Sequence, residues 1–581
     1  MPDTKQRLVP VGGARRDTTE CCEKPPCGLV PNTGLLDSSC ESIAPTVSWR
    51  VNRYTPATET QGGIRLTSRV GHYFPGNRKT IHSDLIFEFQ QQRSNRRDLE
   101  PFGKDTLPFS HAFFLFQAFV RIGLRAVPLN SKMIHPYTEI PELSGNRCAG
   151  GVLRIPVEQD VPFTDRVRAI VDTCEFQRLR QITQLALASR VYPGAVHSRF
   201  EHALGVYHNA LQYLWQLGND PRFAAIVSPH DAEVLIAAAL VHDIGHWPFC
   251  HPVEDLALQQ MPPHEAFASE FLGPNNELTR VLREHWNVEA GEVLQVLTGQ
   301  SDDSSLRLRQ SILSGPIDID KMDYLGRDSQ HCGVPYGRNF DRQRLISSLV
   351  LNEAGDGLAI TSKGKTAAEM MVFARYVMFS EVYWHHAVRS ATTMFARAFY
   401  DVHESLHLSE LFRMTEPEMI RTLCNAVKGR PAEQLTDGLF GRTRRLHKRL
   451  VEYSLFQKPD MYRTLRQLPY RELVECSNRL AHLISSEHKV SLSPVDVLID
   501  APPLHREVEF KVDIYFGAEA TYRPLKEVSP IVAAMSNTAF DDCVKRVRIC
   551  VSENVLPLQL SAESIDELLQ QAVSSCLPGS G

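Results

Sequence analysis

The stretch HDAEVLIAAALVHDIGH, residues 230–246, decides the fold class of this chain. Every residue from 234 to 241 is apolar, so the pattern predicts a strongly apolar, buried helix. His242 and Asp243 follow this run directly. We therefore expect both side chains to project from a rigid support into a cleft.

The ends of this helix carry their own signals. Ser228 is a suitable N-cap, and Pro229 suits the first helical position. Asp231 stands three residues after the serine, as in a capping box. Gly245 is expected to close the helix.

Helical patterns extend from this stretch in both directions, from about residue 150 to about 490. On the N-terminal side a short strand precedes an amphipathic helix, whose apolar positions are Val167, Ile170, Val171 and Cys174. Beyond residue 490 three β-like runs appear, at 495–499, 508–515 and 544–551. The pattern predicts a mostly α-helical protein with a small C-terminal α+β region and a tail that frays after Leu569.

Residues 1 to about 145 differ from the rest in composition. They are rich in Pro, Gly, Ser, Thr and Arg, and stretches such as 89–98 (FQQQRSNRRD) show no sustained helical or strand period. Such a segment buries too little apolar surface to offset its chain entropy, so we expect a disordered extension. The alternative is that translation starts at Met133.

Composition excludes several protein classes. The chain has 581 residues, of which 43% are hydrophobic, and a formal net charge of −5, which argues against a dedicated nucleic-acid coat. Its 13 cysteines contain no CxxC pair, so we expect no zinc ribbon but reduced thiols in the cytoplasm. The most apolar stretch, 109–120, is too short for a membrane span. The GKT at 364–366 lacks the earlier glycine of a phosphate-binding loop.

Four residues form a candidate metal-binding set: His202, His242, Asp243 and Asp320. Two imidazoles and two carboxylates suit Mn, Fe, Zn, Ni or Mg better than a thiolate-seeking metal. The ligand types alone do not select one of these metals.

Three segments carry a resemblance to a known family. HSRFEHALGVYH at 197–208, LVHDIGHWPFCH at 240–251 and GPIDIDKMDYLGRD at 315–328 resemble the signatures of HD-domain phosphohydrolases, in the deoxynucleoside triphosphate triphosphohydrolase branch. The segment 174–206 resembles the same branch. The resemblance runs from about Val152 to about Tyr400, with a weaker echo in VLIDAPP near residue 500.

The resemblance implies a domain organisation. It places an HD catalytic domain at 149–405, after an extension at 1–148, and leaves a helical region at 406–490, a small α+β region at 491–569 and a flexible tail at 570–581. The fold would be an HD-domain helical bundle.

The resemblance also implies roles for individual residues. His202, His242, Asp243 and Asp320 would bind one divalent metal ion, which would polarise a phosphoryl oxygen and activate a water. His251 would be a general acid oriented by Glu254, which lies three residues later and on the same face of a helix. His246 and His264 correspond to histidines that contact phosphate.

Substrate contacts follow from the same resemblance. Gln184 and Leu185 match a pair that contacts the sugar, where an apolar side chain leaves no room for a ribose hydroxyl. The remaining matches are Arg199, Lys321 and Arg375 around the triphosphate, and Tyr324, Asp328 and Tyr383 beside the sugar. One position departs from the pattern: Phe379 stands where relatives carry a histidine, so contacts to the triphosphate or base are expected to differ.

The sequence therefore predicts an enzyme that hydrolyses a dNTP, with dGTP among its substrates, to deoxynucleoside and inorganic triphosphate, and that forms homo-oligomers as relatives do. One alternative is another phosphohydrolase that acts on nucleoside monophosphates, cyclic nucleotides or guanosine tetraphosphate. A second is a nucleic-acid or nucleotide-binding protein, for which the basic run 442–449 (RTRRLHKR) is the candidate contact, although such a run is more often a solvated helix face.

Overall fold

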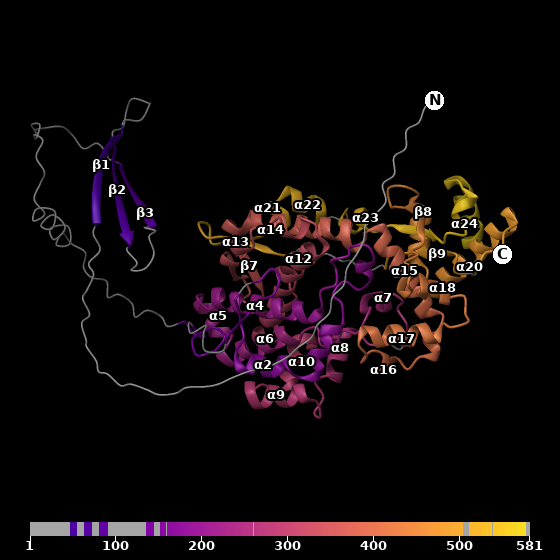
Figure 1. The fold of residues 1–581 in the computed structure, drawn as a ribbon. Helices are drawn as coiled ribbons and strands as arrows, with labels where there is room; N and C mark the ends of the chain where they lie inside the picture. The colour runs from indigo at the N-terminus through magenta and orange to yellow at the C-terminus, as the bar shows by residue number, and fades with distance from the viewer. Residues whose placement is uncertain are drawn as a thin grey trace, which may run out of the picture. The chain divides into compact units, whose positions relative to one another are not determined.

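The computed structural model describes residues 135–144, 151–158, 160–259, 261–503, 511–536 and 539–576, and three earlier strands. The chain divides into two compact units, Met1–Ala126 and Val127–Gly581 (Figure 1). Among the described helices, none combines the length and the apolar composition that a membrane span requires.

The first unit contains an antiparallel sheet. Its strands β1 (Val47–Tyr54), β2 (Gly63–His72) and β3 (Ile81–Gln90) lie in the order β1-β2-β3. We expected a disordered or low-order extension at residues 1–148, and these three strands differ from that expectation. The sequence signal for them is short, because apolar and other residues alternate over only a few positions of each strand.

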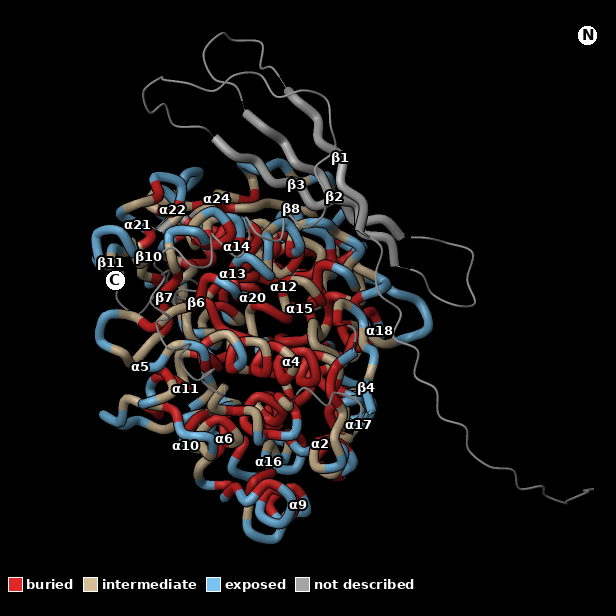
Figure 2. Tube along the Cα trace, turned by 90° about the vertical axis from the view of Figure 1, so that its left-hand side faces the viewer, coloured by how far each residue is buried: buried red, intermediate tan, exposed pale blue. Residues whose placement is uncertain are grey.

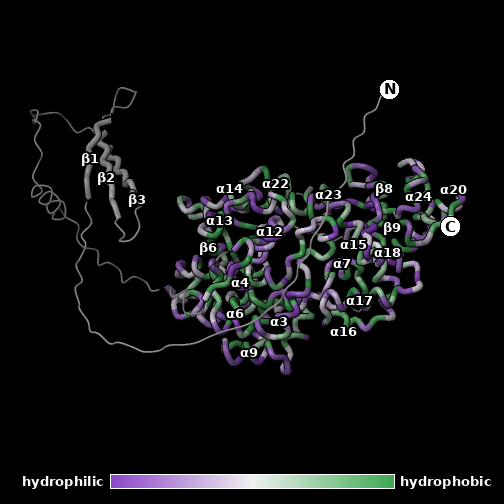
Figure 3. The backbone as a smooth tube through the Cα atoms, in the orientation of Figure 1, coloured by the Kyte–Doolittle hydropathy of each residue, from purple (hydrophilic) through white to green (hydrophobic). Residues whose placement is uncertain are grey.

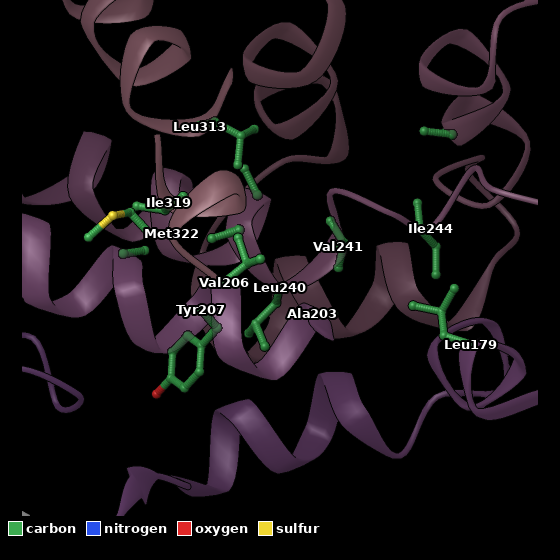
Figure 4. Close-up of a cluster of buried hydrophobic side chains, with 14 of the residues drawn as sticks. Leu179, Ala203, Val206, Tyr207, Leu240, Val241, Ile244, Leu313, Ile319 and Met322 are labelled. Carbon is green, nitrogen blue, oxygen red and sulfur yellow. The ribbon is translucent and has the colours of Figure 1, made fainter. Parts of the chain in front are cut away.

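The core of the second unit is built on three helices, α4 (Arg199–Leu217), α6 (Pro229–Val241) and α12 (Ile319–Cys332). Every side chain of α6 from 234 to 241 is buried, as the sequence predicts. Figure 4 shows side chains of α4, α6 and α12 converging, and Figure 2 shows the buried stretches of these helices in red. This packing holds the ends of three helices in fixed positions.

The cap of α6 is confirmed, but its predicted end is wrong. Ser228 and Asp231 form the capping box, whereas the helix ends at Val241, four residues before Gly245. A Cβ atom at Gly245 would overlap the carbonyl oxygen of His264. This glycine therefore permits close packing against the segment at 264 rather than ending the helix.

The first elements of the second unit include the predicted strand and helix, but the predicted helix is interrupted before Cys174. Strand β4 (Val152–Leu153) precedes α2 (Asp165–Val171), and the apolar side chains of α2 are buried. Thr173 caps a separate helix α3 (Cys174–Arg178), so Cys174 begins a new helix. Residues 135–144, which we placed in the extension, also differ, because Tyr137 is fully buried and donates a hydrogen bond to the carbonyl of Val227 at 2.9 Å.

The remaining α-helices connect and cover this core. They are α5 (Pro221–Ile226), α7 (Cys250–Glu254), α8 (His264–Phe267), α9 (Glu277–Trp286), α10 (Ala290–Thr298), α11 (Ser304–Ser314), α13 (Arg342–Ser347), α14 (Lys365–Met378), α15 (His386–Tyr400), α16 (Leu408–Leu411), α17 (Glu416–Ala426), α18 (Glu433–Phe440), α19 (Pro459–Gln467), α20 (Tyr470–His488), α21 (Leu525–Val528), α22 (Pro530–Ser536), α23 (Ala539–Val544) and α24 (Ala562–Cys576). Outer helices such as α9 carry hydrophilic residues on one face (Figure 3).

The predicted C-terminal strands exist but belong to two sheets. One sheet has the order β8-β12-β9, and the other β11-β10-β7-β6. Their bounds are β6 (Leu349–Leu351), β7 (Leu358–Thr361), β8 (Lys448–Tyr453), β9 (Val497–Asp500), β10 (Asp513–Phe516), β11 (Thr521–Pro524) and β12 (Val547–Val551), while β5 (Val161–Pro162) pairs with β4.

Two predictions for the C-terminal part are wrong. The basic run 442–449 is not a helix face, because it leads into β8, which pairs with β12. The chain does not fray after Leu569, because α24 continues to Cys576 and buries Ala572 and Val573 in a second apolar cluster.

Candidate active site

The four predicted metal ligands come together at the ends of the three core helices. His202 lies on α4, His242 and Asp243 follow α6, and Asp320 lies in the first turn of α12. Nε2 of His202 is 3.0 Å from Oδ1 of Asp320 and 3.2 Å from Nε2 of His242. Oδ1 of Asp243 is 3.3 Å from Nε2 of His242.

The hydrogen bonds of the two imidazoles fit a metal site. Nδ1 of His202 lies 2.8 Å from a carboxylate oxygen of Asp323, and Nδ1 of His242 lies 3.0 Å from the carbonyl of Ala239. Each Nδ1 therefore donates, so both Nε2 atoms, once free of a proton, are electron-pair donors directed at one point. Ligands bound to one ion at about 2.1 Å lie about 3 Å apart, so this spacing suits a divalent cation.

The charges of the site favour a cation as well. Burial would raise the pKa of Asp243, but the Arg199 guanidinium and a hydrogen bond from His246 hold it well below its ordinary value. Burial lowers the pKa of His202, but hydrogen bonds to Asp320 and Asp323 outweigh this and raise it to about 10. A bound cation must displace that proton, so acid opposes metal binding here.

Asp323 is a functional candidate that we did not identify from the sequence. Its side chain is fully buried between His202 and Arg327. Carboxylates that orient a ligating histidine in this way commonly tune metal sites. The available signal was its position three residues after Asp320, which places both on one face of α12.

The predicted acid and its neighbours form a second group beside the ligands. Glu254, at the end of α7, lies with Oε2 3.4 Å from Nδ1 of His251 and with Oε1 2.8 Å from Nδ1 of His264. Burial would raise the pKa of Glu254, but both histidines hold it well below its ordinary range. The His251 side chain is 63% exposed, whereas that of His264 is 16% exposed, so Glu254 is shared, and its shorter contact is with His264.

His246 is a buried member of the histidine group beside the ligands. Its ring is buried and lies 3.8 Å, centroid to centroid, from that of His264. Burial and the Arg199 guanidinium lower the pKa of His246 well below its ordinary value. His246 is therefore a neutral hydrogen-bonding group at neutral pH.

The three predicted phosphate-binding cations lie close to this centre. Arg199 donates to Asp243 at 2.7 Å, and Lys321 donates to Asp318, the N-cap of α12. Arg375 lies on α14, nearly buried, with its guanidinium 5.6 Å from the Phe379 ring. Burial would lower the pKa of Lys321, but the Asp318 carboxylate outweighs this and raises it, even though the charge of Arg375 lies near enough to act against it.

A cavity of about 860 Å³ opens beside the metal-binding set. This volume is typical of sites for nucleotide-sized ligands. Eight predicted residues line it, namely Gln184, Leu185, Arg199, His251, Glu254, Tyr324, Asp328 and Tyr383. Tyr383 donates to Asp328 at 2.7 Å, so the two predicted sugar contacts act as one unit.

One wall of the cavity comes from segments outside the HD motifs. Phe379 and Trp384 line it from the end of α14 onward, and Arg466, Tyr470 and Pro503 line it from the C-terminal part. Arg466, Tyr470 and Pro503 lie far from the HD segments in the chain, and they carry no motif of their own. The C-terminal region therefore completes the site.

Comparison with known proteins defines the class. An HD domain matches residues 199–328, and an HD-associated region matches residues 340–552. Together with the helical fold and the clustered histidines and aspartates, these matches confirm the resemblance. The chain therefore contains an HD domain followed by an HD-associated region.

Particular relatives share parts of the chain. An uncharacterized protein of Methanocaldococcus jannaschii is 29% identical over 392 residues, which are 66% of this chain and 76% of the relative. A deoxynucleoside triphosphate triphosphohydrolase of Dictyostelium discoideum is 26% identical over 324 residues, which are 54% of this chain and 61% of the relative. A solved hypothetical protein from Aquifex aeolicus, 24% identical, covers 72% of this chain and 99% of its own with a TM-score of 0.54, and so shows the same fold.

Proposed function

We propose that this enzyme hydrolyses dNTPs, dGTP among them, to the deoxynucleoside and inorganic triphosphate. One observation carries the proposal: a single cavity joins Gln184 and Leu185 to Arg199, which is bonded to Asp243 of the metal-binding set. A deoxynucleotide with its sugar at Leu185 would have its 5′ ester and α-phosphate at the histidine and aspartate cluster. The triphosphohydrolase names of distant relatives support the same substrate class.

The metal would be held by His202, His242, Asp243 and Asp320. A bound divalent cation supplies Lewis-acid polarisation of a phosphoryl oxygen and lowers the pKa of water. The donor set suits Mn, Fe, Mg, Zn or Ni and does not select one.

The residues around the phosphates neutralise charge and transfer a proton. Arg199, Lys321 and Arg375 neutralise the phosphate chain, and His246 contacts it beside them. His264, held at Nδ1 by Glu254, presents Nε2 for a second phosphate contact. His251 protonates the departing 5′ oxygen of the deoxynucleoside, with Glu254 as its positioning partner.

The sugar end of the cavity selects the deoxynucleotide. Leu185 packs where a ribose 2′-hydroxyl would lie, and Gln184, Tyr324, Asp328 and Tyr383 supply the polar contacts to the sugar. A 2′-hydroxyl facing an apolar side chain loses its hydrogen bonds to water, so binding of an rNTP is penalised. Phe379 provides an aromatic face in place of an imidazole and so changes the contacts at the far side of the nucleotide.

The test is product analysis. Purified protein is incubated with each dNTP, and with each rNTP as control, in the presence of Mn²⁺ or Mg²⁺. Chromatography then separates triphosphate, pyrophosphate and orthophosphate. We expect equal amounts of deoxynucleoside and triphosphate from dNTPs and little from rNTPs, whereas pyrophosphate with a monophosphate would assign a different cleavage site.

A further inference from the structure

A buried ion pair lies behind the metal-binding set. Arg327 donates two hydrogen bonds to Asp323 through Nε and Nη2, both at 2.7 Å, and both side chains are fully buried. The residues are four apart on α12, so one helix holds both partners. Gly205 of α4 lies against them, and a Cβ atom there would overlap both side chains, so the two helices approach closely.

The pair connects directly to a metal ligand. The oxygen of Asp323 that accepts from Nε of Arg327 also lies 2.8 Å from Nδ1 of His202. The two-pronged Arg327 contact fixes the plane of the carboxylate, and the carboxylate fixes the ring of His202. The direction of Nε2 at the metal-binding set thus depends on Arg327.

Arg327 also contacts Glu201 of α4 and the segment that precedes β5. Its Nη1 donates to Glu201 at 2.6 Å and to the carbonyl of Pro156 at 2.8 Å. Glu201 in turn lies 2.9 Å from Nε2 of His331. Arg327 is the junction between the His202 side and this second branch.

The second branch ends at the cavity wall. The His331 ring stacks on that of His197, with centroids 4.3 Å apart. His197 lies 2.8 Å from one oxygen of Asp328, and the other oxygen accepts from Tyr383 at 2.7 Å. Asp328 and Tyr383 line the cavity, so this branch holds the wall that faces the substrate.

We propose that Arg327 is a positioning residue that sets the metal ligand His202 and the cavity residues Asp328 and Tyr383 at once. The inference rests on the proposed metal and substrate sites. Metal affinity can be measured without any nucleotide. Failure of the Arg327 proposal can therefore be distinguished from failure of the dNTP proposal. Among the described residues that line the cavity, neither Arg327 nor Glu201 appears, and neither belongs to the predicted ligand set.

The first test replaces Arg327 with Lys, which keeps the charge but loses the two-pronged contact. We expect Mn²⁺ affinity of the metal-free protein, measured by titration calorimetry, to fall by about 10–100-fold, as for other groups that orient metal ligands. The matched control is Arg309→Lys, since Arg309 is also buried and pairs with Asp231 at 3.0 Å, at the far end of α6 from His242. Equal Mn²⁺ affinities in wild type and a folded Arg327→Lys variant would overturn the proposal.

A second variant provides a test if Arg327→Lys does not fold. It also tests the branch that leads from Glu201 to the cavity wall. Glu201→Gln keeps the shape of the side chain but weakens the contacts to Arg327 and His331. We expect KM for the dNTP to rise several-fold, with a smaller change in Mn²⁺ affinity. Unchanged KM with normal thermal unfolding would show that the second branch does not position Asp328 and Tyr383.

A double variant separates positioning from stability. Asp323→Asn with Arg327→Met removes both buried charges, so thermal stability should recover relative to Arg327→Met alone. Mn²⁺ affinity should stay low, because an amide is a weaker and unfixed partner for His202. Recovery of both together would show that Arg327 only compensates the charge of Asp323 and would contradict the proposal.

Discussion

Glu254 receives two hydrogen bonds from His264, 2.8 Å from its ring and 3.0 Å from its backbone nitrogen, so the carboxylate is anchored from outside its own helix. The same carboxylate lies 3.4 Å from His251. The proposed acid is thus positioned by a group that a second histidine already holds in place.

This arrangement predicts unequal effects of two substitutions. His251→Ala should lower turnover by about 10²–10⁴-fold while Mn²⁺ affinity is retained, since general acid catalysis is usually worth that much. Glu254→Gln should lower turnover less and should also raise KM, because it loosens His264. Steady-state kinetics on both variants, with the exposed His285→Ala as control, provides the check. If His251→Ala turned over normally, His251 would not be the general acid, and His264 would become the candidate.

Removal of one metal ligand should lower metal content without loss of the fold. Asp320→Ala takes away the carboxylate 3.0 Å from His202 and should abolish turnover and reduce bound metal. Elemental analysis and circular dichroism measure the two effects, and Asp172→Ala, at an exposed position, is the control. Wild-type metal content in the Asp320 variant would exclude this residue from the site.

The HD-associated region should influence sugar selection through Glu416. Its Oε2 accepts from the backbone nitrogen and the hydroxyl of Thr183, at 3.0 and 2.7 Å, and Thr183 directly precedes Gln184. Glu416→Gln should loosen that loop and lower the ratio of dNTP to rNTP hydrolysis severalfold.

The control for this prediction is a residue on the same helix as Glu416, α17. Glu418→Gln alters only the capping box of α17, which glutamine can also complete. Both variants are assayed with dGTP and GTP under identical conditions. An unchanged ratio in Glu416→Gln would show that the loop does not depend on this contact.

A buried histidine away from the site predicts a pH effect on stability. Burial lowers the pKa of His447, which is held 2.8 Å from the carbonyl of Val495. The unfolded chain binds this proton more readily, so the stability contribution is present above about pH 6.5 and is lost as the pH falls below it. In His447→Gln the melting temperature should fall less between pH 7 and pH 5 than in wild type, and the same slope in both proteins would refute the assignment.

Local patterns predicted the helical core well. Residues 234–241 are uniformly apolar, so a buried helix followed by His242 and Asp243 was expected and is found. The end of that helix was misplaced because Gly245 serves a packing contact with a segment 19 residues later. Similarly, Tyr137 enters the core only through residues distant in the chain.

The contacts within the candidate site were harder to predict than its members. Motifs identify His202, Asp320 and His251, but they do not show that Glu254 is shared with His264 across a loop. Asp323 was available from helical spacing alone. The wall formed by Arg466 and Pro503 depends on tertiary contacts that no local pattern encodes.

The most direct test of the central claim is hydrolysis of dGTP in H₂¹⁸O with Mn²⁺, followed by mass spectrometry of both products. Attack of water at the α-phosphorus, with His251 protonating the 5′ oxygen, predicts one ¹⁸O atom in triphosphate and none in deoxyguanosine. Labelled deoxyguanosine, or pyrophosphate together with dGMP, would contradict the account.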